Sequence, residues 1–174
     1  MPQLSCTLVA GPAGSGKTTV ARLLAERTRA ALLDKDTLAT GFSEALLVAL
    51  GSNPDDRESH TYLTCVRPLE YAQLEAAAVD VLSSGVSVVL SAPFGVELRD
   101  VTWFNAFRYR MGSLNASVSV IWVSTSPDVM RDRIARRGCS RDTWKLDNWD
   151  SYVQGLPSAP TVPHELFDND IDVC

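Results

Sequence analysis

Short apolar runs alternate along the chain with longer stretches whose apolar residues recur at helical spacing. The apolar runs predict five strands, at residues 4–10, 30–33, 86–90, 116–123 and 165–169. The stretches between them predict helices, at residues 19–27, 44–50, 58–82, from 99 onward, 127–137 and 148–154. Strands that alternate with helices in this way are typical of an α/β fold built on a parallel sheet.

Two of these stretches carry more detailed expectations. The 58–82 stretch is predicted to kink or break before Pro68, and its buried stripe is predicted to comprise Val66, Leu69, Leu74, Ala77 and Val81. The 86–90 run is continuously apolar, which predicts a strand that is buried on both faces.

Composition and charge narrow the class of protein. A chain of 174 residues with 45% hydrophobic and 21% charged residues is typical of one globular domain, so we expect a single domain over 1–174. A net charge of −5 disfavours a dedicated nucleic-acid-binding protein. No apolar run approaches the length of a membrane span and no charged-then-apolar leader is seen, so we expect no membrane association and a cytoplasmic location.

Cysteines and histidines give no sign of a metal site. The four cysteines are far apart and form no C-x-x-C pair, so we expect free thiols, with Cys6 buried in the first strand. They are Cys6, Cys65, Cys139 and Cys174. The two histidines, His60 and His164, are isolated from one another.

Candidate chemistry begins with the stretch Gly11 to Thr18, which fits the pattern G-x-x-x-x-G-K-[ST]. A predicted strand precedes it and a predicted helix follows it, as a phosphate-binding P-loop requires. Its backbone N–H groups would line a concave nest, Lys17 would reach the β- and γ-phosphates of ATP, and the Thr18 hydroxyl would bind Mg²⁺. The nucleotide contacts that we expect are Gly11, Ala13, Gly14, Ser15, Gly16, Lys17, Thr18 and Thr19.

An acidic residue follows the second predicted strand, where functional residues of such sheets are found. We predict that Asp36 acts as the general base for a substrate hydroxyl, or binds a Mg²⁺-bound water. The alternative is that Asp36 only caps the helix that begins there. Asp34 competes for the same role.

The third strand ends in Ser91, where a motor ATPase would carry the Walker-B carboxylate. This departure favours a small-molecule kinase, in which another carboxylate does that work.

Arginines gather at the end of the 127–137 helix, which is predicted to begin after Ser126 and to end at Gly138. Arg133 and Arg137 are four residues apart and share one helix face. We predict that Arg133 stacks on adenine or contacts phosphate, and that Arg137 stabilises the phosphates as part of a lid over 137–147. Arg141 is the second choice as lid arginine, and a solvated basic helix end is the alternative for all three.

The acceptor site has the weakest pattern. We expect the acceptor-binding region over about 41–75, with Arg67 set against an anionic group and Arg99 in contact with substrate or phosphate. For each of these arginines an ordinary surface position is the alternative.

With these residues placed, the chain resembles the small P-loop kinases: gluconate kinase, shikimate kinase, chloramphenicol phosphotransferase and the broad group of AAA-type bacterial ATP-binding kinases. Asp36 resembles the aspartate that acts as base in chloramphenicol phosphotransferase. The stretch 89–92 followed by Arg99-Asp100 is similar to gluconate kinase, and the Arg133–Arg137 pair is similar to the arginines of a lid helix. The rest of the gluconate kinase lid and tail, and the glycine-rich third strand of shikimate kinase, are not found, so acceptor specificity does not transfer.

The resemblance implies a P-loop NTPase three-layer sandwich with a five-stranded parallel sheet in the order 2-3-1-4-5, flanking helices and an arginine-bearing lid. It implies an ATP- and Mg²⁺-dependent phosphotransferase that acts on a hydroxyl of a sugar acid, nucleoside or antibiotic-like natural product, in resistance or biosynthesis. The alternatives are a nucleotide-dependent binding protein without rapid turnover and a polynucleotide 5′-hydroxyl kinase. We expect a monomer or a homodimer.

Overall fold

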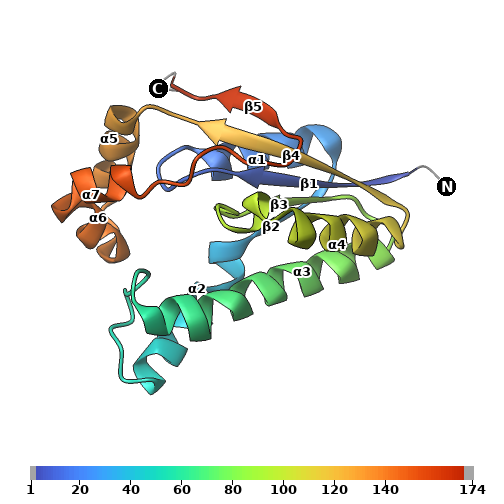
Figure 1. Ribbon diagram of the computed structural model, residues 1–174. Coiled ribbons are helices and arrows are strands. Elements are labelled where there is room, and N and C mark those ends of the chain that lie inside the picture. The colour runs from blue at the N-terminus through green and yellow to red at the C-terminus, as the bar shows by residue number, and fades with distance from the viewer. Residues whose placement is uncertain (1–2, 171–174) are drawn as a thin grey trace.

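The computed structural model describes residues 3–170, and it centres on a five-stranded parallel sheet (Figure 1). The strands are β1 (Leu4–Ala10), β2 (Ala31–Asp34), β3 (Val88–Ser91), β4 (Ala116–Ser124) and β5 (Glu165–Asp168). Their order across the sheet is β2-β3-β1-β4-β5, and all four neighbouring pairs are parallel. The predicted fold class and strand order are therefore confirmed. Cys174 lies outside the described residues.

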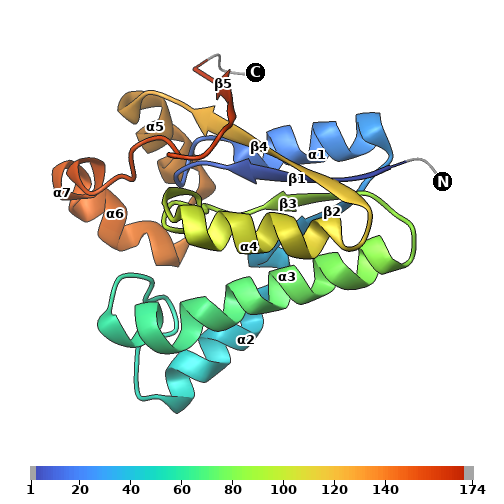
Figure 2. The same cartoon turned by 45° about the vertical axis from the view of Figure 1, so that its right-hand side comes forward.

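Helices cover both faces of the sheet. The longer ones are α1 (Lys17–Thr28), α2 (Lys35–Ala49), α3 (Arg67–Ser83), α4 (Val101–Gly112) and α5 (Pro127–Arg137). Short α6 (Thr143–Asp147) and α7 (Trp149–Gln154) follow α5. Figures 1 and 2 show α1 on one side of the sheet and α3 and α4 on the other, while α5, α6 and α7 gather beyond the ends of β1 and β4. No helix in the described part of the chain is long and apolar enough to cross a membrane.

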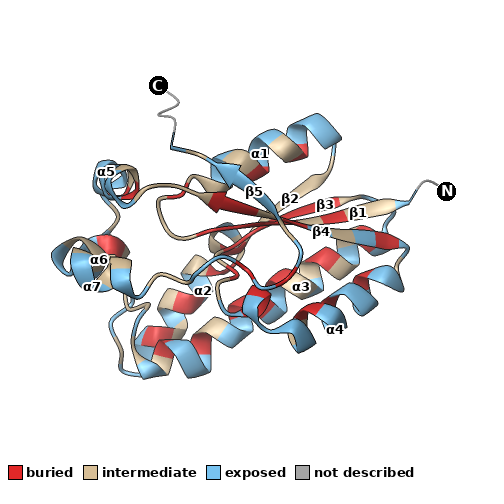
Figure 3. Cartoon of the chain, turned by 45° about the horizontal axis from the view of Figure 1, so that its top comes forward, coloured by how far each residue is buried: buried red, intermediate tan, exposed pale blue. Residues whose placement is uncertain are grey.

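The core lies in the two layers between the sheet and these helices. The larger cluster packs β1, β3 and β4 against α3 and α4, and the smaller one packs them against α1. All four residues of β3 are buried, and Cys6 has no exposed surface, as predicted. Figure 3 shows these buried central strands beside the exposed edge strand β5.

The predicted helical stretch 58–82 differs from expectation at its start. A π-helical turn, Tyr62–Val66, leads directly into α3. A π-turn holds more residues than an α-turn, so it shifts the buried face relative to uniform helical spacing. Leu69, predicted to be buried, is 58% exposed, whereas Tyr71 is only 6% exposed. The buried stripe of α3 comprises Glu70, Tyr71, Leu74, Ala78 and Leu82.

Helix α2 begins at Lys35, well before the predicted 44–50, whereas the boundaries of α5 and α4 agree with local signals. Helix α5 follows Ser126 and has Pro127 in its first turn, and Gly138 ends it with a φ of 60°. Helix α4 begins after Asp100, whose carboxylate accepts hydrogen bonds from the backbone N–H groups of Thr102 and Trp103. These caps hold the crossover segments that follow β3 and β4 at the carboxyl edge of the sheet.

Candidate active site

The segment Gly11 to Gly16 joins β1 to α1 as a P-loop does. Gly16 precedes α1 with a φ of 85°, and no side chain caps the first N–H groups of that helix. Among the described residues, the N–H groups of Thr19 and Val20 donate to the Gly16 carbonyl oxygen, so those of Lys17 and Thr18 are left to bind an anion. The Lys17 ammonium reaches back to the Pro12 carbonyl oxygen at 3.3 Å, and burial lowers the pKa of Lys17 to about 8. The Ser15 hydroxyl is fully buried and has no hydrogen-bond partner within the described chain.

Arg133 and Asn169 hold the main chain of the P-loop through hydrogen bonds to its carbonyl oxygens. The Arg133 guanidinium donates to the carbonyl oxygens of Gly14 and Ser15 at 3.5 and 3.4 Å, and to the Asn169 carbonyl oxygen at 3.0 Å. The Asn169 side-chain amide donates to the Ser15 carbonyl oxygen at 2.8 Å. Arg133 therefore lies at the P-loop, where it holds the main chain; its stacking on adenine stays a prediction.

Three oxygen-bearing side chains meet where α1 begins. The Thr18 hydroxyl donates to the Asp34 carboxylate at 3.2 Å and lies 3.5 Å from the Ser91 hydroxyl. Asp34 and Ser91 are register partners at the ends of β2 and β3. Among the described residues there is no group of three His, Cys, Asp or Glu that could hold a metal by itself. Mg²⁺ keeps several waters and shares phosphate oxygens, so this set of hard oxygen donors fits it.

Asp34 was considered from the sequence only as a rival base. The structure gives it two other contacts: it approaches Thr18, and it caps α2 by accepting from the N–H groups of Asp36 and Thr37 at 3.0 and 3.2 Å. The cap of α2 is therefore Asp34, not Asp36. The position of Asp34 beside Ser91 could have been predicted from the sequence, because Asp34 and Ser91 each end a predicted strand and therefore lie at the same carboxyl edge of the sheet.

Asp36 projects from the first turn of α2 with 46% of its side chain exposed. One carboxylate oxygen lies 3.2 Å from the Lys35 ammonium, and the other lies 2.9 Å from the Arg141 guanidinium. Burial opposes ionisation of this carboxyl, but Lys35, Arg141 and Lys17 together lower the pKa of Asp36 to about 2. Asp36 therefore stays ionised at neutral pH.

Residues 137–147, which the sequence predicts to form a lid, are joined through Asp142, whose side chain is 2% exposed. Arg137 pairs with this carboxylate at 2.5 Å, and Lys145 pairs with it at 3.0 Å. Arg141 instead contacts α2, where it donates to the Asp36 carboxylate and to the Thr40 hydroxyl. Of the two lid arginines considered, Arg141 is thus the one in contact with the acidic residue after β2.

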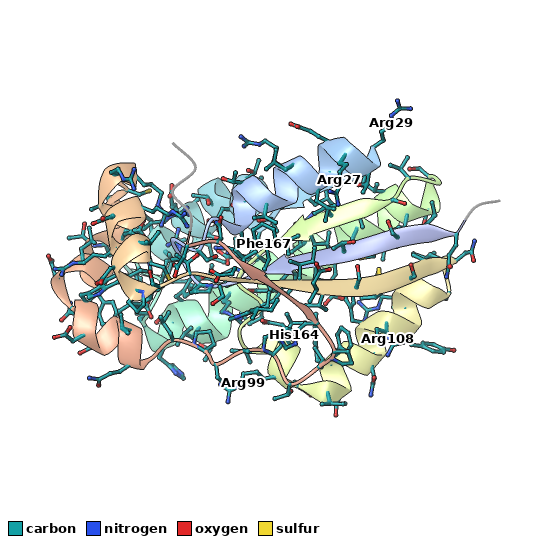
Figure 4. The ribbon with its side chains drawn as sticks, turned by 90° about the horizontal axis from the view of Figure 1, so that it is seen from above. Arg27, Arg29, Arg99, Arg108, His164 and Phe167 are labelled. Atoms are coloured by element: carbon teal, nitrogen blue, oxygen red, sulfur yellow. The ribbon has the colours of Figure 1, made fainter. Side chains whose placement is uncertain are left out.

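The two predicted acceptor arginines have different surroundings. Arg67 binds both oxygens of Glu97, at 2.8 and 2.9 Å, and its guanidinium lies 4.4 Å from the centre of the Tyr71 ring. Arg99 is exposed and makes no ion pair with any described residue (Figure 4). Arg67 is therefore held in place by Glu97 and Tyr71, while the guanidinium of Arg99 can bind an anionic ligand without breaking an ion pair of the described chain.

A cavity of about 750 Å³, called here the central cavity, brings six of the predicted site residues together. The predicted site residues that line it are Ala13, Lys17, Asp36, Arg67, Arg99 and Arg137. Arg141 and Lys35 also line it, whereas Arg133 does not. Lys35 was missed from the sequence, because a lysine between two aspartates reads locally as an exposed charge.

Comparison with known proteins places this geometry in a family. Residues 7–156 match the family model described as an AAA domain. None of the curated proteins compared with the chain matches it.

Solved structures of low sequence identity share the fold. An APS kinase from Mycobacterium tuberculosis, in complex with AMPPNP and APS, is 18% identical, has a TM-score of 0.58, and covers 99% of this chain and 92% of its own. A sugar kinase from Janibacter sp. HTCC2649 is 17% identical with a TM-score of 0.58, covering 96% and 85%. A gluconokinase from Sinorhizobium meliloti 1021 is 16% identical with a TM-score of 0.55, covering 96% and 83%. The chain therefore belongs to the AAA domain family, and its fold is that of the small P-loop kinases.

Proposed function

We propose that the protein transfers the γ-phosphoryl group of ATP to a hydroxyl of a small molecule. The observation that carries this proposal is that Lys17 of the P-loop and the carboxylate of Asp36 line one cavity, with lid arginines at its edge. A phosphate tail held by Lys17 and a hydroxyl held by Asp36 would then meet inside that cavity. The bond that forms joins the acceptor oxygen to the γ-phosphorus, and the bond that breaks joins that phosphorus to the β–γ bridging oxygen.

The chain supplies positive charge where phosphoryl transfer needs it. The charge of the transferred group is spread over its equatorial oxygens, so positioning and charge stabilisation account for most of the catalysis. Lys17, the free N–H groups of α1 and a lid arginine would stabilise that charge. Thr18, Asp34 and Ser91 would hold Mg²⁺, which neutralises phosphate charge when it is bound.

Asp36 acts chiefly by orienting the acceptor. A carboxyl with a pKa of about 2 is a weak proton acceptor at neutral pH. In a loose transition state the hydroxyl bonds weakly to phosphorus, so early removal of its proton gains little. The carboxylate therefore accepts the hydroxyl hydrogen bond, aligns the oxygen with the γ-phosphorus and takes the proton late.

Both oxygens of Asp36 are paired in this structure, one with Lys35 and one with Arg141. An acceptor hydroxyl must therefore displace one of the two cations. Arg141 is the one that can leave, because it belongs to the lid, whereas Lys35 is adjacent to Asp36 in α2. Arg141 would move to the phosphates of ATP and free the carboxylate for the acceptor.

The acceptor classes that fit are sugar acids, nucleosides and antibiotic-like natural products. The central cavity joins aromatic side chains, such as Tyr62 and Tyr71, to several cations. This mixture suits a polar molecule that has a ring or an anionic group. A cytoplasmic role in resistance or biosynthesis would follow from such an acceptor.

The decisive experiment is a screen for ATP consumption across sugars, sugar acids, nucleosides and antibiotics, with mass spectrometry to detect the gain of one phosphate. The variant Asp36→Asn is compared with Asp80→Asn, an exposed aspartate on α3. Asp36→Asn should lose turnover at least about a hundredfold while it still binds ATP, because the neutral amide is a weaker acceptor for the hydroxyl hydrogen bond that aligns the substrate and cannot take the proton. Asp80→Asn should match the parent protein.

Three outcomes would overturn this proposal in part or in full. Full turnover by Asp36→Asn would remove Asp36 from the reaction. Tight ATP binding with no phosphorylated product from any compound would favour a nucleotide-dependent binding protein. Phosphorylation of oligonucleotide 5′-hydroxyls with a steep dependence on salt would instead indicate a polynucleotide kinase.

A further inference from the structure

A network of four polar side chains lies next to Asp36, and three of its members fall within the 41–75 region that was expected to bind the acceptor. Its members are Lys35 and Ser43 of α2, Tyr62 of the π-helical turn and Glu70 of α3. Glu70 is at its centre. One Glu70 oxygen accepts from the Ser43 hydroxyl at 2.7 Å, and the other accepts from the Lys35 ammonium at 2.5 Å and the Tyr62 hydroxyl at 2.9 Å.

The network is buried and internally satisfied. The Lys35 and Glu70 side chains are 7% and 3% exposed. Burial opposes the ionised form of Glu70, yet Lys35, Ser43 and Tyr62 hold the pKa of Glu70 below its usual value. A buried ion pair is often no more stabilising than an apolar pair of the same volume, so such a pair is weak support for a purely structural role. Its position must then be considered.

Lys35 connects this network to the central cavity. Its ammonium lies between two carboxylates, Glu70 at 2.5 Å and Asp36 at 3.2 Å, and it also lines the cavity. Asp36 itself is half exposed, and within residues 3–170 the ion-pair partners of its carboxylate are Lys35 and Arg141. Since Arg141 belongs to the lid, Lys35 is the partner that remains when the lid moves.

We propose that Lys35 is a positioning residue for phosphoryl transfer: anchored by Glu70, its ammonium fixes one oxygen of Asp36 so that the other faces the acceptor hydroxyl. This inference rests on the proposed function of Asp36. The anchoring draws on three separate elements, α2, the π-helical turn and α3, so the ammonium cannot follow the carboxylate if Asp36 rotates. A catalytic group held in this way is pre-organised, and no rotamer must be fixed during the reaction.

The test must remove the ammonium without leaving a buried charge. Lys35→Met alone would leave the Glu70 carboxylate buried and unpaired, which costs stability. The double variant Lys35→Met/Glu70→Gln removes both charges and keeps an amide that can bind Ser43 and Tyr62. The matched control is Glu75→Gln/Arg110→Met, which removes another ion pair between a carboxylate of α3 and a basic residue. That pair has no contact with Asp36.

The expected result has a kinetic and a structural part. With the acceptor found in the screen, kcat of Lys35→Met/Glu70→Gln should fall at least about tenfold, because Asp36 samples unproductive rotamers. KM for ATP should stay within about twofold, since the P-loop is unchanged. A crystal structure of the variant should show the Asp36 carboxylate rotated or in two conformations. The control variant should keep the parental kcat and the parental Asp36 orientation.

Three results would overturn the proposal. The first is an unchanged kcat in the Lys35→Met/Glu70→Gln variant. The second is an equal fall of kcat in both double variants, which indicates a general loss of folding. The third is an Asp36 carboxylate that keeps its orientation without Lys35. The crystal structure needs no acceptor, so it tests the role of Lys35 even if Asp36→Asn proves fully active and the proposed function fails.

Discussion

The proposed nucleotide end and the proposed acceptor end of the central cavity are built in different ways. At the nucleotide end, the P-loop offers main-chain N–H groups and its own lysine, all from residues 11–19, and Arg133 and Asn169 support it from behind. At the acceptor end, the cavity wall consists of side chains from α2, α3 and the lid, held by ion pairs between residues far apart in the chain.

This difference explains why the P-loop could be predicted from the sequence and the ion-pair network could not. A main-chain nest depends on a short run of glycines at fixed spacing, so local sequence is enough to recognise it. An ion-pair network depends on which helices pack together, and no local spacing reports that. It also suggests that the two ends respond differently to substitution. The predictions below test this from the largest expected effect to the smallest.

The largest loss of activity is expected on substitution of Lys17. Lys17→Ala removes the charge that should meet the β- and γ-phosphates, so phosphoryl transfer should fall at least about a thousandfold. The matched control, Arg22→Ala, removes an exposed charge from the same helix and should keep the parental rate. Steady-state kinetics and thermal unfolding are measured for both. A parental rate in Lys17→Ala with intact folding would remove the P-loop assignment.

Two arginines at the proposed acceptor end should differ in their effect on stability, because Arg67 is in an ion pair and Arg99 is not. Arg67→Met leaves the Glu97 side chain, 9% exposed, without its cation, so the free energy of unfolding should fall by about 2–3 kcal/mol. Arg99→Met breaks no ion pair of the described chain and should change it by less than about 0.5 kcal/mol. Denaturant titration gives both values. Equal losses for the two arginines would contradict the assigned difference.

A smaller effect is expected where the P-loop touches Asn169. In Gly16→Ala the new Cβ would lie 2.3 Å from the Asn169 side-chain nitrogen, at a φ of 85°, so stability should fall by about 1–3 kcal/mol. Gly41→Ala is the control, because nothing beyond its chain neighbours and the nearby backbone of α2 lies within 4 Å of the new Cβ. It should stabilise by about 0.5–1 kcal/mol. Thermal unfolding of both variants checks the sign, and a stabilised Gly16→Ala would disprove this packing.

Much of the fold could be predicted from the sequence, because β1, β3 and β4 are distinct apolar runs and α5 carries its own start and stop signals. Ser126, Pro127 and Gly138 fix the ends of α5, and the strand order followed from resemblance to a known family. The stripe of α3 could not be read correctly, since the π-helical turn before it changes the spacing that the prediction assumes to be uniform.

The candidate site was predicted in part. Lys17, Asp36 and Arg137 reach one cavity as expected, and each has a local signal: a motif, a strand end or a helix spacing. The contacts of Asp34 with Thr18, Lys35 with Glu70, and Arg141 with Asp36 were not foreseen. Their separations along the chain are 16, 35 and 105 residues, so only the packing of the fold brings them together.

Asn169 has a practical consequence for anyone who engineers this protein. Its side-chain amide donates to the Ser15 carbonyl oxygen and its main-chain carbonyl accepts from Arg133, although 154 residues separate it from Ser15. A chain shortened to end just after β5 would therefore lose a support of the nucleotide loop while the sheet stayed complete. Weaker retention on an ATP-affinity resin, with an unchanged circular-dichroism spectrum, would reveal that loss.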